Sequence, residues 1–325
     1  MHAIALIVQP GSVPSSVTST LDIFGIADRF TTVENRVRVD LLSAAGGAIK
    51  LSELISVETQ RIPASLAGYD AVIIPGFLAA DVTSLDEQLR TIWQPVITKL
   101  RAIDHGPLIG ASCYATFVLA ESGLLDGKSA TTTWWLQREF GERYSKVRLD
   151  ADKALIVDGK RITAGAMTAH IDLSMQVLRS LKGADMARCV ASIMLVNDAR
   201  TSQRPFMLLP RHFTDPLAQR AADWMTEHIA QEFSARELAA ACHVSYRTLH
   251  RRFSDAARRP PLEYLQALRV EHAKALLDVD GMSLEEIVTK VGYIDVSSFR
   301  RLFSRLTGLS PAQYRRQFQR AGRLH

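Results

Sequence analysis

The first part of the chain alternates short apolar runs with segments whose apolar residues recur at helical spacing. The strand candidates are Ala3–Val8, Val37–Ser43, Ala71–Pro75 and Pro107–Ala111. The last two are continuously apolar, which is typical of parallel strands covered on both faces. The helical stretches are Ser16–Arg29, Asp86–Ile103, Tyr114–Ser122 and a long one from about Thr168 to Ala199. This alternation predicts a doubly wound α/β domain over residues 1–200.

A stretch with several prolines follows this domain. Pro205 and Pro210 lie close together and Pro216 comes soon after, and prolines at this density interrupt any helix. We therefore expect a linker at residues 201–216. From Leu217 onward the pattern is helical throughout and contains no strand candidate, so residues 217–325 are predicted to form an all-α domain.

The all-α domain repeats itself. Residues 233–253 can be laid over residues 282–303, with an offset that grows from 49 (Ser234 with Ser283) to 50 (Phe253 with Phe303). One extra residue therefore sits in the turn of the second copy. The match extends to two further pairs, Pro261 with Pro311 and Tyr264 with Tyr314.

Each copy carries the signals of two short helices. Both begin with Ser-x-x-Glu, in which the serine and the glutamate satisfy the first backbone N–H groups reciprocally; these are Ser234 with Glu237 and Ser283 with Glu286. Each helix breaks after about two turns, and a second helix starts after a capping residue, Ser245 or Asp295. Helix, short turn and helix form a helix-turn-helix, whose second helix enters the major groove of DNA.

The second helix of each copy has an apolar and a polar side. Leu249, Phe253, Phe299 and Phe303 stand at i, i+4 spacing and are expected to point inward. The candidates for DNA contacts on the polar sides are Arg247, His250 and Arg251 in the first copy and Ser297, Ser298, Arg300 and Arg301 in the second. Arginine can donate two hydrogen bonds to a guanine edge, whereas serine discriminates less. An ordinary solvated helix face would carry a similar pattern.

One helix is expected between the two copies. Residues 261–279 would form a rod of about 27 Å at 1.5 Å per residue, close to the ~34 Å of one turn of DNA. Two recognition helices on this rod would enter successive major grooves on one side of the duplex. A mismatch in spacing would bend the DNA at a cost of a few kcal/mol.

The charge distribution agrees with a polyanionic partner. Residues 211–325 hold 18 Lys and Arg against 13 Asp and Glu, whereas the remainder holds 21 of each, so the net charge of +5 resides in the last third. Such asymmetry favours double-stranded DNA as the partner, and a solvated basic surface is the alternative.

Cysteine usage and hydropathy indicate the compartment. Cys113, Cys189 and Cys242 are odd in number and form no C-x-x-C pair, which argues against a disulfide framework or zinc site. No run approaches the roughly 20 apolar residues of a membrane span. The apolar N-terminus lacks a basic leader and is expected to be a strand, not a signal peptide. We expect a cytoplasmic protein with no metal, cofactor or membrane partner.

Residues 217–325 resemble the AraC-type DNA-binding domain. The segment Gly308-Leu-Ser-Pro-Ala-Gln-Tyr314-Arg-Arg is similar to that family's signature G-x-S-P-x-x-Y-R. The resemblance implies that the polar faces named above read bases. The first copy departs from the pattern, because Arg258 and Pro260 stand where the second has Gly308 and Ser310.

The N-terminal domain carries a cysteine between a strand and a helix. Cys113 follows the apolar run 107–111 and opens the helix 114–122, so its thiol would be exposed near the positive end of a helix dipole. A thiol in such a place can have a lowered pKa and attack a carbonyl carbon. The alternative is a small hydrophobic residue that happens to be cysteine.

The surrounding sequence resembles the class I glutamine amidotransferase-like (PfpI-like) domain of GlxA-type AraC regulators. The segment 119–134 carries the resemblance, which covers about residues 3–200 and implies a flavodoxin-like doubly wound sheet. The sharp turn that carries the cysteine, between the strand and the helix, is called the elbow. Enzymes of that family have a histidine after the elbow, and many of these regulators have the sequence T-T-H-W in that stretch. This chain has Thr133 there, which cannot act as a general base near neutral pH.

Other partners for the thiol are not evident either. Ser16, Thr18 and Ser19 occupy the stretch of the first helix where an assisting acid often stands in the family. His105 and His170 remain, but nothing in the sequence places either beside Cys113. The resemblance therefore implies a domain without catalytic residues.

An elbow that lacks a base is better suited to binding. Open α/β sheets place their crevice at the carboxyl ends of the strands. We expect Gly76, Cys113, Tyr114, Thr133 and Trp134 to line a pocket there for a small metabolite. Redox sensing through Cys113 is an alternative, as is a core role for Trp134 and its neighbour.

The sequence as a whole predicts a ligand-responsive transcription regulator. Its C-terminal domain would bind DNA, and its N-terminal domain would bind a small-molecule effector and form a homodimer. One rival interpretation is a cysteine-dependent amidase or hydrolase with a DNA-binding tail. Another is an architectural DNA-binding protein without a ligand.

Overall fold

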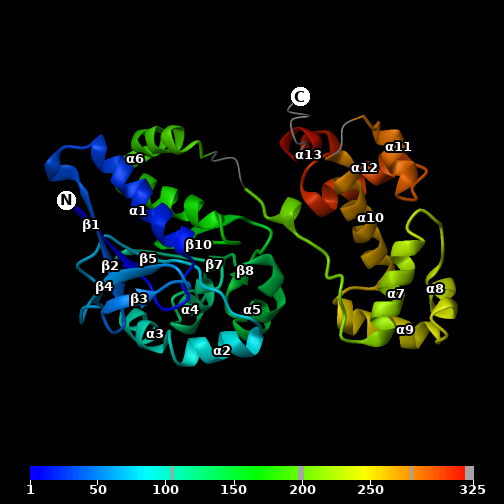
Figure 1. The fold of residues 1–325 in the computed structure, drawn as a ribbon, viewed down its shortest axis with the longest axis horizontal. Helices are drawn as coiled ribbons and strands as arrows, with labels where there is room; N and C mark the ends of the chain where they lie inside the picture. The colour runs from blue at the N-terminus through cyan, green and yellow to red at the C-terminus, as the bar shows by residue number, and fades with distance from the viewer. Residues whose placement is uncertain (104–105, 197–200, 279–280, 319–325) are drawn as a thin grey trace. The chain divides into compact units, whose positions relative to one another are not determined.

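The computed structural model describes residues 1–325 except 104–105, 197–200, 279–280 and 319–325. The chain divides into two compact units, Met1–Gln203 and Arg204–His325 (Figure 1). The boundary falls inside the stretch 201–216 that was expected to be a linker.

The first unit contains an eight-stranded sheet of order β3-β4-β2-β1-β5-β6-β10-β9. The strands are β1 His2–Ile7, β2 Val37–Ser43, β3 Gly47–Lys50, β4 Ser56–Arg61, β5 Ala71–Ile74, β6 Leu108–Ser112, β9 Leu155–Asp158 and β10 Arg161–Ala164. The six inner strands β4, β2, β1, β5, β6 and β10 run parallel to one another. The edge strands β3 and β9 pair antiparallel with their neighbours. All four expected strands are confirmed to within a residue at each end.

Helices cover both faces of this sheet (Figure 1). α1 Pro14–Arg29 and α6 Ala169–Met194 lie on one face, and α2 Val82–Arg90, α3 Gln94–Arg101, α4 Ala115–Glu121 and α5 Gln137–Arg143 on the other. Successive residues of β1 alternate between the two cores, with Ile4 and Leu6 against α1 and α6, and Ala5 and Ile7 against the other helices. This two-sided burial explains why the central strands read as unbroken apolar runs.

Two of the expected helices differ from the structure. The stretch Asp86–Ile103 forms two helices, α2 and α3, because Pro95 lies in the first turn of α3 and has no N–H to continue a helix through that point. The long helix begins at Ala169 as expected, but Gly183 interrupts it with a φ of +86°. It ends at Met194, where Leu195 takes a left-handed φ of +52°, and so is shorter than the expected stretch to about Ala199, which lies outside the described residues.

The second unit is all α in its described residues. Its helices are α7 Pro216–Glu227, α8 Ala235–Ala241, α9 Tyr246–Ala257, α10 Pro261–Leu277, α11 Leu284–Lys290, α12 Val296–Thr307 and α13 Pro311–Phe318. The internal repeat is confirmed: α8 and α11 each have 7 residues, α9 and α12 each have 12, and both capping boxes are present.

The turns of the two copies follow the same backbone path. His243 and Gly292 take left-handed φ values of +56° and +78°, each two residues beyond the first helix of its copy. Arg258 and Gly308 do the same after the second helix, with φ of +60° and +74°. The arginine thus keeps the turn of its glycine counterpart, although a side chain in this conformation costs about 1–2 kcal/mol.

The two copies have separate hydrophobic cores, and α10 belongs to both (Figure 1). Tyr264 and Leu268 pack into the core of the first copy, whereas Val270 and Leu277 pack into the core of the second. The spacer helix was expected, and with 17 residues it is about 25 Å long.

A second contact joins the copies at the middle of α10. Arg269 is 8% exposed and donates from Nε to the carbonyl of Ile229 (2.9 Å) and from Nη2 to that of Gln231 (2.6 Å). Its guanidinium carbon lies 5.2 Å from the ring centroid of Tyr293. A Cβ on Gly292 would lie 2.7 Å from the Ile229 oxygen. We call these five residues the Arg269 junction.

Gly292→Ala should destabilise the second unit, because it adds steric overlap with Ile229 to the cost of a positive φ. We expect a loss of about 3 kcal/mol, of which about 1–2 kcal/mol comes from the backbone conformation alone. Gly281→Ala is the matched control in the same unit, since Gly281 has a φ of +99° and no atom within 4 Å of an added Cβ. Urea unfolding measures both variants, and equal losses would show that the junction is not tightly packed.

Candidate DNA interface and candidate ligand site

The residues predicted to contact DNA lie on the outer sides of α9 and α12. Five of the seven are exposed and two are half-buried; the exposed ones are Arg247, Arg251, Ser297, Arg300 and Arg301, and the half-buried ones are His250 and Ser298. The inward residues Leu249, Phe253, Phe299 and Phe303 have no exposed surface, as expected. Each second helix therefore has one buried and one polar side.

The N-terminal turns of these two helices are capped. Ser245 accepts a hydrogen bond from the N–H of Thr248 (3.1 Å). Asp295 accepts from the N–H groups of Ser297 (3.1 Å) and Ser298 (2.8 Å), and its hydrogen bonds with Ser298 hold the pKa of that carboxyl below its usual range. These turns matter because recognition helices contact base edges with their N-terminal residues.

The arginines of these helices differ in what they contact. Among the described residues, Arg247, Arg251, Arg300 and Arg301 form no ion pair, and Arg301 donates to the hydroxyl of Ser298 (2.9 Å). A cation without an acidic partner keeps its charge available for a phosphate or a guanine edge.

Arg252, next in the chain to Arg251, has a structural role that the sequence did not reveal. It forms a bidentate pair with Asp215 at 2.9 and 2.8 Å, and this pairing lowers the pKa of Asp215. Asp215 also caps α7, so the pair ties α9 to the start of α7. The local sequence does not reveal that Arg252 is paired while Arg251 is exposed, because Asp215, the partner of Arg252, lies 37 residues away in the chain.

The elbow at Cys113 is present but closed. Cys113 follows β6, has a φ of +56° and is 1% exposed. Burial raises the pKa of its thiol to about 12, against a smaller lowering by the N–H of Tyr114. The expected exposed thiol of lowered pKa is therefore wrong, because the loss of hydration outweighs the favourable end of the helix.

The structure brings three of the five expected pocket residues together. A Cβ built on Gly76 would lie 3.0 Å from the Cβ of Cys113, so glycine allows the two residues to pack closely. Tyr114 follows directly and accepts a hydrogen bond from the indole of Trp135 (3.1 Å). It is Trp135, not the expected Trp134, that contacts this tyrosine.

The segment after the elbow is deeply buried. Thr133 has no exposed surface, and its hydroxyl finds no hydrogen-bond partner in the described part of the chain. Thr132, which the sequence did not single out, bonds the hydroxyl of Thr116 (2.6 Å) and lies 3.5 Å from the carbonyl of Cys113. Trp134 is half-buried and meets Trp135 edge to face, with ring centroids 5.2 Å apart.

A buried histidine also lies near the elbow. His170 on α6 contacts Ser112, the residue before Cys113, through Nδ1 (2.8 Å), and Thr20 on α1 through Nε2 (2.8 Å). Burial lowers its pKa to about 3, so the ring is neutral and both nitrogens are already engaged. It joins three elements and offers no free base to the thiol. His105 lies outside the described residues.

Comparison with known families matches both units. The DJ-1/PfpI family model matches residues 15–180, and a helix-turn-helix domain model matches residues 238–317. Within the described residues, every helix is too short or too polar to pass through a lipid bilayer.

Named relatives match across both units. The chain is 27% identical to the HTH-type transcriptional regulator CdhR of Pseudomonas aeruginosa over 312 residues, which cover 94% of this chain and 89% of that protein. It is 26% identical to the HTH-type transcriptional regulator GlxA of Rhizobium meliloti over 224 residues, covering 68% and 69%.

The fold of the first unit also occurs among solved structures. A crystal structure from Vibrio parahaemolyticus aligns with a TM-score of 0.50 at 18% identity and covers 60% of this chain and 99% of that one. At this identity the match shows a common fold. The chain belongs to the DJ-1/PfpI family, and it joins that domain to an AraC-type helix-turn-helix domain.

Proposed function

We propose that this protein is a sequence-specific DNA-binding transcription regulator that reads DNA with Arg247, His250 and Arg251 of α9 and Ser297, Ser298, Arg300 and Arg301 of α12. The observation that carries the proposal is the pair of helix-turn-helix copies built on one helix, each with an outer face of arginines that lack acidic partners. The names of its relatives support the same function.

The shared helix sets the expected mode of binding. α10 is about 25 Å long, somewhat shorter than the ~34 Å turn of DNA. Entry of α9 and α12 into successive major grooves therefore requires the duplex to bend, which costs a few kcal/mol and depends on base sequence.

We further propose that the N-terminal unit binds a small effector and pairs two copies into a homodimer, and that the protein acts in the cytoplasm. The unpartnered buried hydroxyl of Thr133 supports a bound polar group at the elbow residues Gly76, Cys113, Tyr114, Thr133 and Trp134. An effector acts only if it binds two arrangements of the protein with different affinities.

A hydrolase is the less favoured alternative. The thiol of Cys113 is protonated and buried, and the one described histidine near it is engaged on both sides. Covalent catalysis needs a thiolate and a base within hydrogen-bond reach.

Selection of bound DNA from a random pool by the full chain tests the main proposal. We expect an enriched site with two half-sites about one helical turn apart. Recovery of sequences without any common element would contradict it.

Arg251→Ala and Arg301→Ala should each weaken binding to the selected site by about 1–3 kcal/mol and relax the base preference in one half-site. Fluorescence anisotropy at fixed salt measures the affinity. Arg90→Ala, which removes an exposed arginine from the first unit, is the control for net charge. If both recognition variants bind like the control, the base contacts are wrongly assigned.

Arg269→Lys should loosen the spacing between the half-sites, because lysine keeps the charge but cannot bond both carbonyls and stack on Tyr293 in the same way. Repeating the selection with spacers of varied length should give a broader distribution for the variant, with about tenfold weaker binding, or ~1.4 kcal/mol, at the preferred spacing. An unchanged spacer preference would show that the junction does not set the distance.

Cys113 should resist alkylation in the native protein, because its raised pKa and burial leave almost no accessible thiolate near neutral pH. Mass spectrometry after treatment with iodoacetamide measures this, with the half-buried Cys189 as an internal reference. Modification of Cys113 faster than Cys189, together with loss of a hydrolytic turnover in Cys113→Ser, would favour the enzyme.

A further inference from the structure

A pocket opens on the first unit, lined by none of the elbow residues. It has a volume of about 660 Å³, within the roughly 300–1,000 Å³ of small-molecule sites. One wall is the apolar edge strand β9, over 155–157, where Val157 is 47% exposed. Arg148 and Lys153 contribute cations, and Ser129 and Thr201 contribute hydroxyls.

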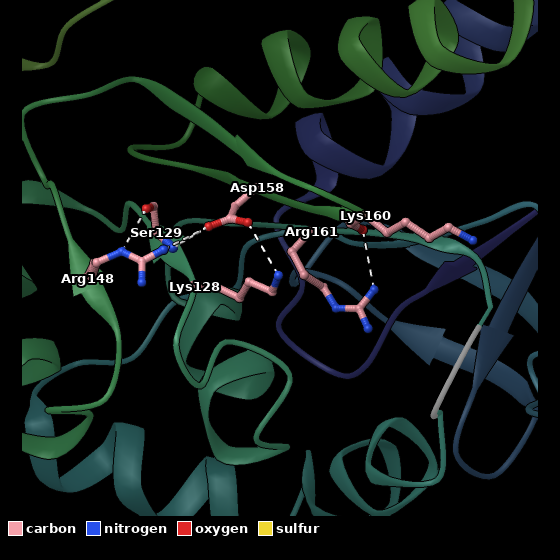
Figure 2. Close-up of polar contacts among 6 residues, drawn as sticks. All are labelled: Lys128, Ser129, Arg148, Asp158, Lys160 and Arg161. Carbon is pink, nitrogen blue, oxygen red and sulfur yellow. Dashed lines mark hydrogen bonds and ion pairs between the residues drawn. The ribbon is translucent and has the colours of Figure 1, made fainter.

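Two short strands hold the arginine in place. β7 Ser129–Ala130 pairs with β8 Arg148–Leu149, and Figure 2 shows dashed lines from Arg148 to both Ser129 and Asp158. Arg148 donates from Nε to the Ser129 hydroxyl (3.3 Å) and from Nη2 to Asp158 (3.3 Å). Of the five N–H donors of a guanidinium these contacts use two, so the group is oriented while it keeps donors for a ligand.

The charged residues that line the pocket are two cations, Arg148 and Lys153, and one acid, Asp150. Asp158 is shared between two cations, since its other oxygen lies 3.4 Å from Nζ of Lys128 (Figure 2). Lys153 forms no ion pair with the described residues. Asp150 is the acid in the lining, and it already accepts a hydrogen bond from the N–H of Asp152 (3.1 Å). Cations beside an exposed apolar wall suit a small organic anion.

The pocket wall continues directly into the end of the first unit. Thr201 accepts a hydrogen bond from the N–H of Ala154 (3.2 Å), and Ser202 pairs with Lys153. Gln203 follows and is 4% exposed, and its side chain donates to the carbonyl of Lys153 (3.0 Å).

Gln203 also reaches the segment behind the elbow. Its side chain donates to the carbonyl of Thr132 (2.9 Å) and accepts from the N–H of Ala166 (2.9 Å). A Cβ on Gly165 would lie 2.2 Å from the Gln203 amide carbon, so the side chain fills the space that this glycine leaves. The next residue, Arg204, begins the second unit.

We propose that this pocket is an effector site for a small carboxylate with a short apolar body. The carboxylate binds Arg148 and Lys153, and the apolar body covers Val157. Occupancy acts on the DNA-binding unit through Thr201, which lines the pocket, and through Ser202 and Gln203, which follow it and end the first unit. This inference rests on the proposed function, since an effector needs a regulated output.

Isothermal titration calorimetry of the full chain with benzoate tests the site, with inorganic phosphate as an anion that lacks an apolar body. Benzoate should bind, and phosphate at least tenfold more weakly. The double variant Arg148→Gln/Lys153→Gln should weaken benzoate binding at least tenfold. Lys146→Gln, which removes an exposed cation paired with Asp126 outside the pocket, should bind benzoate like the parent chain.

Three results would overturn the proposal: no heat with benzoate up to its solubility, equal binding by the double variant, or phosphate binding as tightly as benzoate.

Benzoate should also change the affinity of the parent chain for its selected DNA at least threefold, and that of the double variant not at all. DNA binding without benzoate is measured in the same assay, so failure of the effector site and failure of DNA binding give different results. If Thr133→Val, and not the double variant, removed the benzoate response, the site would be the elbow.

Discussion

The buried guanidinium of Arg269 holds together the part of the molecule on which DNA reading depends. Each helix-turn-helix copy has its own small core, and cores of this size give little stability by themselves. α10 joins the two cores as a rod, but a rod alone does not stop the copies from turning about it. Two carbonyl bonds and one ring contact replace the water that Arg269 loses, and they fix the first copy against Tyr293 of the second.

The elbow of the first unit illustrates how burial decides between chemistries that share one geometry. A cysteine in a strained turn before a helix suits nucleophilic attack when it is exposed to solvent. In this chain the thiol is covered, and His170 is held neutral between Ser112 and Thr20. The architecture of a reactive site is thus retained while both groups that could ionise are kept uncharged.

The first unit ends in a contact that joins its two candidate ligand sites. Gln203 bonds Lys153 on the rim of the cationic pocket and Thr132 behind the elbow. Because a buried amide in several hydrogen bonds is costly to displace, residues 201–203 belong to the first unit. In the second unit, the hydroxyl of Tyr264 donates to the carbonyl of Pro210 (2.9 Å), so this carbonyl of the proline-containing stretch has a partner.

Much of the fold could be predicted from local pattern. Four strands of the sheet were found, two of which, β5 and β6, are continuously apolar because they are buried on both faces, and the repeat located both helix-turn-helix copies, their caps and the extra turn residue. The strands β3, β4, β9 and β10 were not predicted, since each has only four to six residues and includes a charged residue. The break between α2 and α3 had a local signal in Pro95 that outweighed the apolar spacing.

By itself the sequence determined which segments become helices and strands, where they are capped and which helix faces are polar, because these depend on residues a few positions apart. Only the tertiary structure decided that Arg252 is an anchor while Arg251 is exposed, that Arg269 joins the two copies and that Cys113 is a protonated, covered thiol. Those outcomes depend on charge, hydration and packing between residues far apart in the chain, and no local spacing encodes them.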